Sequence, residues 1–303
     1  MIFLLLIGAY TPSSVERSER QMNMVSKQVA LVTGASSGIG QATAELLAAH
    51  GFTVFGTSRV PDQRERSYTL LPLDVCSDAS VDAAVQSLLD QAGRIDVLVN
   101  NAGYAMVGAI EETSMADAQA QLDTNLFGVL RMIKAVLPVM RKQGSGRIVN
   151  VSSVVGHVAP PYVGLYATSK FALEGLSEAL RAEVRPFGIE VAMVEPSFVK
   201  TRIETLQPGN PLAVYAPARQ AAMQTLSASV ESGMEPRAVA QVILRAATTR
   251  PRLRYLVGRD AKVLVLLKRL LPGTLFERLS RRIFRAGNSA ARQPLAQPLV
   301  SGK

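Results

Sequence analysis

The chain has 303 residues, which is enough for one large hydrophobic core, and its 48% hydrophobic and 19% charged residues are typical of a globular protein. The single cysteine, Cys76, excludes a disulfide framework and a cysteine-based metal site, and two distant histidines, His50 and His157, argue against a zinc centre or a Ser-His-Asp triad. Of the net charge of +9, residues 250–303 carry +11 and the first 249 residues −2, so the part expected to fold lacks the basic stripe of a nucleic-acid-binding protein.

Residues 1–26 are predicted to stand outside the folded domain. Their first nine residues, MIFLLLIGA, are apolar but too short to span a bilayer, which needs roughly 20 residues, and they lack a basic segment and a cleavage site. The polar run that follows is typical of disorder. Two interpretations stay open: a start assigned too early, with Met22 or Met24 close to the true start, or a leader that associates weakly with a membrane.

From residue 27 onward strands alternate with helices. Strands are expected at 29–33, 53–59, 67–75, 94–103, 146–153, 189–196 and 253–258. Helices are expected at about 39–49, 77–93, 115–140 and 236–248, with one more that contains Tyr166 and stops at Pro186 and Gly188. The alternation predicts an α/β protein with right-handed crossovers, built on a single Rossmann-type doubly wound parallel sheet of about seven strands over residues 27–258.

A glycine-rich turn, TGASSGIG, follows the first strand and opens the first helix. Its glycines, Gly34, Gly38 and Gly40, allow a tight turn, and the helix N-terminus offers free N–H groups to a phosphate. In isolation such a turn could be purely structural. The motif has no P-loop lysine, which argues against ATP or GTP hydrolysis.

The end of the second strand indicates which dinucleotide binds. An acidic residue there would bind a ribose 2′-hydroxyl, whereas an arginine accommodates a 2′-phosphate. Here the strand ends with Ser58 and Arg59, and no acid precedes Asp62. We therefore expect NADP(H) rather than NAD(H); the alternative is that Arg59 is a solvated surface residue.

Tyr166 and Lys170 lie four residues apart in YATSK, so on a helix their phenol and ammonium share a face. An adjacent ammonium favours the phenolate, which would suit proton transfer. Ser153, at the end of the fifth strand, could hold a substrate oxygen against the tyrosine. The YxxxK spacing alone is a weak signal, and its weight comes from the motifs that precede it.

With TGASSGIG, NNAG, Asn125, Ser153 and YATSK in this order, residues 27–257 resemble the short-chain dehydrogenase/reductase family. The resemblance implies that Tyr166 gives or takes the proton and that Lys170 holds the nicotinamide ribose and lowers the pKa of Tyr166. It also implies that Ser153 orients the substrate oxygen and that Asn125 anchors a water in a proton relay to Lys170.

The motifs and the resemblance together predict cofactor contacts at the ends of the strands. These are Gly34, Ser36, Ser37, Gly38, Ile39, Gly40, Ser58, Arg59, Asp74, Val75, Asn101, Ala102, Gly103, Tyr166, Lys170, Pro196, Val199 and Thr201. Asp74 and Val75 are expected at the adenine, Asn100 near the ribose and sheet centre, and Thr201 at the nicotinamide amide. One departure is Ser197, which stands where the family usually has glycine.

Within the family, GTSR, EPSFVKT and LRYLVG with the basic tail look closest to the branch of 17β-hydroxysteroid and retinol dehydrogenases. By analogy the substrate is a hydrophobic ketone, aldehyde or alcohol, steroid- or retinoid-like. The family also implies a homo-oligomer. We expect the protein in the cytoplasm, and the basic tail leaves open a peripheral contact with a membrane. The rival hypothesis is a catalytically silent dinucleotide-binding regulator, which would have little need to keep the catalytic set together.

Two further segments are expected beside the substrate. Residues 204–235 are predicted to form a mobile lid, which we call the lid segment. The residues predicted to wall an apolar pocket are Leu206, Leu212, Val214, Tyr215 and Met223 with Val155, Val158 and Tyr162. Residues 259–303 form a basic, leucine-rich helical tail broken at Pro272 and Gly273, which either packs on the domain or lies on an anionic membrane; disorder is expected after Gly287.

Overall fold

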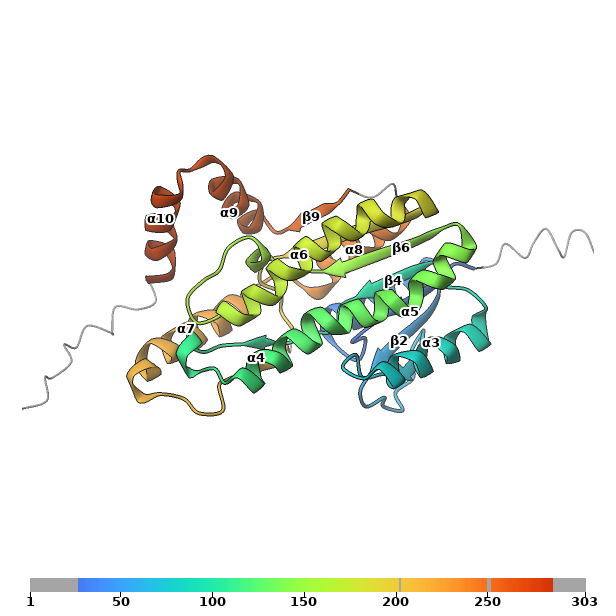
Figure 1. Cartoon of the computed structure of the whole chain (residues 1–303), viewed down its shortest axis with the longest axis horizontal. Coiled ribbons are helices and arrows are strands. Elements are labelled where there is room, and N and C mark those ends of the chain that lie inside the picture. Colours follow the sequence, from blue (N-terminus) through green and yellow to red (C-terminus); the bar gives the residue numbers. More distant parts are fainter. Residues whose placement is uncertain (1–26, 202, 250–251, 286–303) are drawn as a thin grey trace, which may run out of the picture.

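A computed structural model describes residues 27–201, 203–249 and 252–285, with the backbone alone at 280–285 (Figure 1). The leader predicted at 1–26 and the end of the tail, residues 286–303, lie outside these ranges.

One parallel sheet runs through the centre of the domain, with seven strands in the order β3-β2-β1-β4-β6-β7-β9. The strands are β1 Val29–Val32, β2 Thr53–Ser58, β3 Thr69–Pro72, β4 Val97–Asn100, β6 Gly146–Val151, β7 Ile189–Pro196 and β9 Arg254–Val257. The predicted class of fold is confirmed. Because strand order reverses between β1 and β4, a ligand is expected at the carboxyl ends of these two strands.

Helices cover both faces of this sheet (Figure 1). The helices on one face are α3 Asp78–Ala92, α5 Gly128–Gln143 and α6 Gly164–Val184; those on the other are α2 Gly38–Ala49 and α8 Pro236–Thr248. The helix expected at 115–140 consists of α4 Met115–Leu122, a π-helical turn η2 Asp123–Phe127, and α5. Short 3-10 turns are η1 Ile110–Glu112, η3 Val154–Gly156, η4 Arg185–Phe187 and η5 Ala213–Tyr215.

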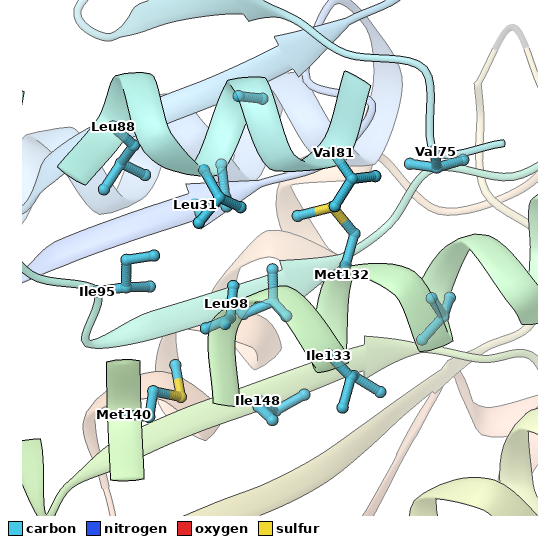
Figure 2. Packing of buried hydrophobic residues seen from close by; sticks show 14 of the residues in the cluster. Leu31, Val75, Val81, Leu88, Ile95, Leu98, Met132, Ile133, Met140 and Ile148 are labelled. Atoms are coloured by element: carbon cyan, nitrogen blue, oxygen red, sulfur yellow. The ribbon is translucent and has the colours of Figure 1, made fainter. Parts of the chain in front are cut away.

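The two hydrophobic clusters follow from the alternation of side chains along each strand. In β1, Val29 and Leu31 point into the cluster under α3, α5 and α6, whereas Ala30 and Val32 point into the cluster under α2 and α8. Figure 2 shows the first cluster, in which Leu31 of β1 lies between the side chains of α3 and those of α5. A strand buried on both faces holds its carboxyl end in a fixed place, and the functional residues lie at these ends.

The lid segment is joined to the domain by a second, two-stranded sheet. β5 Ala105–Met106 pairs in parallel with β8 Thr205–Leu206. Two-residue strands carry no periodic signal, so the sequence did not predict this pairing. After β8 come η5 and the helix α7 Ala216–Glu231.

After β9 the chain forms two more helices, α9 Arg259–Leu270 and α10 Gly273–Arg285, which project from one end of the domain (Figure 1). The break falls at Pro272 because proline disfavours the helical conformation of the residue before it. Among the described residues, none of the helices combines the length and hydropathy that crossing a membrane requires.

Candidate active site

A cavity of about 870 Å³ opens at the carboxyl ends of the central strands. It begins at the glycine turn after β1 and extends past the start of α6 to one face of α7 in the lid segment. Predicted residues that line it are Gly34, Ser36, Ser37, Gly38, Ile39, Ser58, Arg59, Asp74, Val75, Asn101, Ala102, Gly103, Ser153, Tyr166, Lys170, Pro196, Val199 and Thr201. Nearly all the predicted site residues are therefore brought together in one space.

The glycine turn has the backbone that its sequence requires. Gly34 and Gly38 have φ of +65° and +57°, in the left-handed region that favours glycine. Gly40 has another role from the one predicted: it does not line the cavity, and a Cβ on it would lie 2.2 Å from the carbonyl oxygen of Gly34. Gly40 thus lets α2 pack closely on the turn.

One threonine joins the glycine turn to the NNAG segment, residues 100–103, by hydrogen bonds. Thr33 Oγ1 accepts hydrogen bonds from the backbone N–H groups of Asn101, at 2.9 Å, and Ala102, at 3.0 Å. In return Asn101 Nδ2 donates to the carbonyl oxygens of Thr33 and Gly34, at 3.0 and 3.1 Å. Asn100 points away into the sheet, where it donates to Asn150 at 2.9 Å. These buried bonds fix the floor of the cavity.

Arg59 stands at the rim of the same end of the cavity. Its side chain is 73% exposed, and its Nη2 lies 3.2 Å from the Glu204 carboxylate at the start of the lid segment. Ser58 donates its hydroxyl to the carbonyl oxygen of Val60 at 3.1 Å. At the end of β3, Asp74 accepts a hydrogen bond from the Cys76 amide at 2.9 Å, which shapes the turn there.

The catalytic residues predicted on α6 meet Ser153 in the middle of the cavity. Lys170 Nζ lies 5.7 Å from the centre of the Tyr166 ring and donates to the carbonyl oxygen of Val151 at 2.9 Å. Ser153 follows β6 and its hydroxyl accepts the Val155 amide at 3.3 Å. A phenol, an ammonium and a hydroxyl therefore line the same part of the cavity, with Ser153 and Lys170 buried and Tyr166 half-buried.

Burial dominates the acidity of this pair. Burial raises the pKa of Tyr166 to about 12, against the opposing effect of the Ser153 hydroxyl. Burial also lowers the pKa of Lys170 to about 8, against the opposing effect of the Glu174 carboxylate. The expected lowering of the tyrosine pKa is outweighed by desolvation here. At neutral pH the phenol therefore keeps its proton and suits a proton donor.

Asn125 lies in the π-helical turn between α4 and α5, behind the cavity. Its Nδ2 donates to the carbonyl oxygen of Tyr104 at 2.9 Å and to Ser169 Oγ at 3.1 Å, and its Oδ1 accepts the Tyr104 amide at 3.1 Å. The wider π-turn turns this side chain inward, and such turns often occur at functional sites. Of the hydrogen bonds found for Asn125, none is to Lys170, so its role in a relay stays a prediction.

Comparison with known proteins agrees with this geometry. The family model described as short chain dehydrogenase matches residues 28–210. The chain belongs to the short-chain dehydrogenase family. The Bacteroides thetaiotaomicron protein named 3-ketodihydrosphingosine reductase is 40% identical over 244 residues, which cover 78% of this chain and 90% of that protein.

Solved structures of this family are similar as well. A short-chain dehydrogenase from Streptomyces avermitilis has a TM-score of 0.74 and 35% identity, covering 86% of this chain and 99% of its own. A short-chain dehydrogenase from Burkholderia phymatum, solved in complex with NAD, has a TM-score of 0.72 and 27% identity, covering 80% and 93%. The chain is therefore an oxidoreductase that acts on C=O and CH–OH groups with a nicotinamide dinucleotide.

The serine that departs from the short-chain dehydrogenase pattern has a structural role. Ser197 is not in the left-handed region, where among described non-glycine residues only Tyr162 is found, so its position does not need glycine. Its hydroxyl donates to Asp260 in the first turn of α9 at 2.9 Å. The loop that carries Thr201 beside Gly38 is thus tied to the tail, and the usual glycine is replaced without strain.

The substrate end of this dehydrogenase cavity differs from the prediction. Val155 and Tyr162 line it as expected, but the other predicted wall residues do not. Leu206, Leu212 and Val214 are exposed, whereas Val158 is buried. The wall comes instead from one face of α7 and from the loop after β7. Its residues are Phe198, Ile203, Ala221, Ala222, Thr225, Leu226, Ser229 and Val230.

A buried ion pair that the sequence did not reveal anchors α7. Glu112 in η1 is fully buried at its carboxylate and pairs with Arg219 of α7. It also accepts the backbone N–H groups of Ala109 and Leu212, both at 2.9 Å. Burial alone would raise the pKa of Glu112, but these hydrogen bonds and Arg219 lower it. The carboxylate therefore stays ionised and clamps the lid segment onto the domain.

A second buried charge cluster lies beside Lys170 and outside the cavity. Glu174 accepts Arg254 Nε at 2.9 Å, and Glu195 lies 3.4 Å from the same nitrogen and 2.9 Å from His157 Nε2. His157, Glu174 and Glu195 bring three potential metal ligands within 4.8 Å of one another, but Arg254 supplies the positive charge between the carboxylates. The distant sequence positions of these residues hid the cluster.

Proposed function

We propose that this short-chain dehydrogenase is an NADP(H)-dependent reductase of a ketone or aldehyde on a hydrophobic molecule. One observation carries the proposal: a single cavity joins the glycine turn and Arg59 to Tyr166 and then to an apolar wall. A catalytically silent regulator would need only the part of the cavity formed by the glycine turn and Arg59.

The residues at the cofactor end fit a phosphorylated dinucleotide. The Ser37 side chain makes no capping hydrogen bond to α2, so the helix's first N–H groups remain for a pyrophosphate. A Cβ at Gly34 would lie 3.0 Å from Ala102, so only glycine leaves that approach open. Arg59, with Ser58 beside it, would hold the 2′-phosphate of NADP(H). When bound, the dinucleotide supplies the hydride chemistry.

The chain's own residues then handle the substrate oxygen. Ser153 holds the carbonyl oxygen by a hydrogen bond, and Tyr166 donates its proton to that oxygen as the carbonyl carbon is reduced. Lys170 keeps a positive charge beside the phenol, which favours the phenolate left after proton transfer. The reverse reaction would use the same groups with the proton returning to Tyr166.

The substrate class follows from the wall. Its α7 face is built largely of small residues, Ala221, Ala222, Thr225 and Ser229, with Leu226 and Val230 beside them, which leaves room for a bulky and mainly apolar substrate. A relative 40% identical is named as a reductase of 3-ketodihydrosphingosine, a ketone on a long alkyl chain. We therefore favour a long-chain ketone over the steroid- or retinoid-like substrates that the tail and loop motifs suggested.

The test is NADPH consumption by the full chain with a long-chain 3-ketone, a steroid ketone and retinal, each repeated with NADH. We expect turnover with NADPH and the highest kcat/KM for the long-chain ketone. Binding of NADPH without turnover of any carbonyl would refute the proposal and favour the silent regulator.

A further inference from the structure

The helix α9 has apolar residues on opposite faces. Its inner face packs on the loop after β6: Ala261 and Val265 are buried against Val154, with Leu264 and Val155 partly buried around them. Val154 and Val155 both line the cavity. The domain thus holds α9 at the substrate end of the site.

The outer face of α9 has no partner in the described structure. Val263, Leu266 and Leu270 are 55%, 54% and 70% exposed. Their spacing of three and four residues puts them on one stripe, opposite Ala261 and Val265. Leu275, at the start of α10, adds a fourth residue that is 48% exposed. A surface helix normally keeps this face polar, so an apolar stripe here marks a contact surface.

Cations flank this outer stripe. Lys262 and Arg269 are exposed on the same helix, and Arg259 begins it. The sequence of α10 adds four arginines against one glutamate. Apolar residues between cations match the boundary between the headgroups and acyl chains of an anionic bilayer. A second copy of the chain fits less well, because two such faces would bring like charges together.

We propose that the outer stripe of α9, with the start of α10, docks on an anionic lipid bilayer. Leucine and valine side chains enter the interface, and Lys262 and Arg269 pair with lipid phosphates. Since α9 packs on residues that line the cavity, docking brings the substrate end close to the bilayer. That consequence rests on the proposed function, whereas the docking itself does not.

The test is co-sedimentation of the full chain with vesicles of phosphatidylcholine and phosphatidylserine, against vesicles of phosphatidylcholine alone. Two double variants probe the surface: Leu266→Glu with Leu270→Glu, and Lys262→Glu with Arg269→Glu. The matched control is Arg141→Glu with Lys142→Glu, an exposed basic pair at the end of α5. Each surface variant should lower partitioning to anionic vesicles roughly tenfold or more, because one loses buried apolar area and the other loses cations near the anionic surface. The control variant should partition like the unmodified chain, and binding to phosphatidylcholine alone should stay unchanged.

Partitioning of the surface variants equal to that of the unmodified chain would overturn the proposal, as would failure of the unmodified chain to bind anionic vesicles. Light scattering tests the alternative, in which a second copy of the chain binds the outer stripe. If the Leu266→Glu and Leu270→Glu variant loses a dimer that the unmodified chain forms, and vesicles bind neither, the stripe is an interface between copies. None of these readings needs turnover, so they stand apart from the proposed activity.

A different observation, the buried charge cluster beside Lys170, carries a second inference. Glu174 follows Lys170 by one helical turn on α6, and its carboxylate is nine-tenths buried. Among the described residues, Arg254 is the guanidinium that pairs with both Glu174 and Glu195, and it also pairs with Glu178, so three carboxylates share its charge. Glu174 Oε1 has no hydrogen-bond partner among the described residues. Burial and the neighbouring Glu195 carboxylate raise the pKa of Glu174, against the opposing effect of the Arg254 guanidinium. One guanidinium cannot offset several carboxylates, so Lys170, one helical turn away on α6, is the next cation available to Glu174.

We infer that Glu174 is a positioning residue that keeps Lys170 in its charged form during reduction. Among the described residues, the charged or titratable groups that face it are Lys170 on its own helix, Glu195 on β7, His157 after η3 and Arg254 on β9. The negative charge favours the ammonium of Lys170, against burial, which lowers the pKa of that group to about 8. This inference rests on the proposed function.

Glu174→Gln removes the charge that supports the ammonium, so the pKa of Lys170 should fall further. The alkaline limb of kcat/KM for ketone reduction should then move to lower pH, by roughly one unit for a close opposite charge. The matched control is Glu178→Gln, one turn further along α6, because Glu178 also pairs with Arg254, at 2.7 Å, but is half-exposed.

A changed melting temperature with an unmoved alkaline limb would show that Glu174 is only structural and would overturn the inference. An equal shift in Glu178→Gln would do so too, because the effect would then act through Arg254. Absence of any activity in the unmodified chain would instead refute the proposed function, so the two failures are distinct.

Discussion

The two ends of the cavity are built in different ways. At the cofactor end the backbone makes the shape: two glycines in the left-handed region and hydrogen bonds from Thr33 to the NNAG segment. At the substrate end side chains make it: one face of α7, held by the ion pair between Glu112 and Arg219. The backbone end depends on few residue types, whereas the side-chain end can change its wall without changing the fold.

This difference determines which residues set the specificity for cofactor and for substrate. A phosphate is recognised by N–H groups that every residue carries, so the cofactor end needs glycines more than any particular side chain. An apolar substrate is recognised by the volume and shape of side chains, so the wall on α7 decides what fits. The catalytic residues lie where the two ends meet. Substitutions should therefore separate cofactor binding, chemistry and substrate binding.

The largest expected effect is at the junction. Tyr166→Phe removes the proton donor but keeps the ring, so we expect kcat for ketone reduction to fall by roughly 10²- to 10⁴-fold. Fluorescence titration should give an NADPH Kd close to that of the unmodified enzyme, because the cofactor end is untouched. A variant that turns over at the original rate would remove Tyr166 from the mechanism.

The next largest effect is expected at the substrate end, in the ion pair that anchors α7. Glu112→Gln leaves the buried guanidinium of Arg219 without its counter-charge, and breaking a buried pair costs roughly 3 kcal/mol in the free energy of unfolding. Because the pair anchors α7, KM for a long-chain ketone should rise while the NADPH Kd does not. The neighbouring Glu111→Gln is the control: Glu111 is exposed and accepts only the Tyr215 hydroxyl, so its loss should cost less than about 1 kcal/mol. Equal denaturation midpoints for both variants would contradict this.

How far the sequence predicts each end reflects the same contrast. The turn with Gly34 and Gly38, and the helical pair Tyr166 and Lys170, are local patterns whose spacing carries their geometry, so the cofactor end and the catalytic set could be found. The ion pair that anchors α7 could not be predicted, because Glu112 and Arg219 are 107 residues apart and their pairing depends on the tertiary fold. The wall prediction was largely wrong for a related reason: we expected no helix within the lid segment, and the face of α7 that meets the cavity depends on the tertiary fold.

The third prediction tests the backbone end. Alanine is a better helix former than glycine, yet Gly40→Ala should lower the free energy of unfolding by roughly 1–3 kcal/mol, because its Cβ would overlap the Gly34 carbonyl oxygen. NADPH affinity should fall with it, since the turn must shift. Gly175→Ala, on an exposed part of α6 with open space around it, is the control and should stabilise by about 0.5–1 kcal/mol. Chemical denaturation of both variants compares them directly, and a stable Gly40→Ala enzyme with unchanged NADPH affinity would disprove the packing role.

The smallest effect is expected at the rim of the cofactor end, where Arg59 contacts the lid segment. Arg59 is mostly exposed and its partner Glu204 belongs to the lid segment, so solvent screens the pair and its contribution to stability is small. Arg59→Ala should weaken NADPH binding roughly tenfold and leave NADH binding unchanged, because only NADPH offers a charged 2′-phosphate. Arg64→Ala, an equally exposed arginine that does not line the cavity, controls for the loss of positive charge. Glu204→Gln should act in the opposite direction: with its competing carboxylate gone, Arg59 is free for the phosphate, and NADPH should bind somewhat more tightly. An unchanged ratio of NADPH to NADH affinity in both Arg59→Ala and Glu204→Gln would show that Arg59 is a solvated surface residue and that another group selects the cofactor.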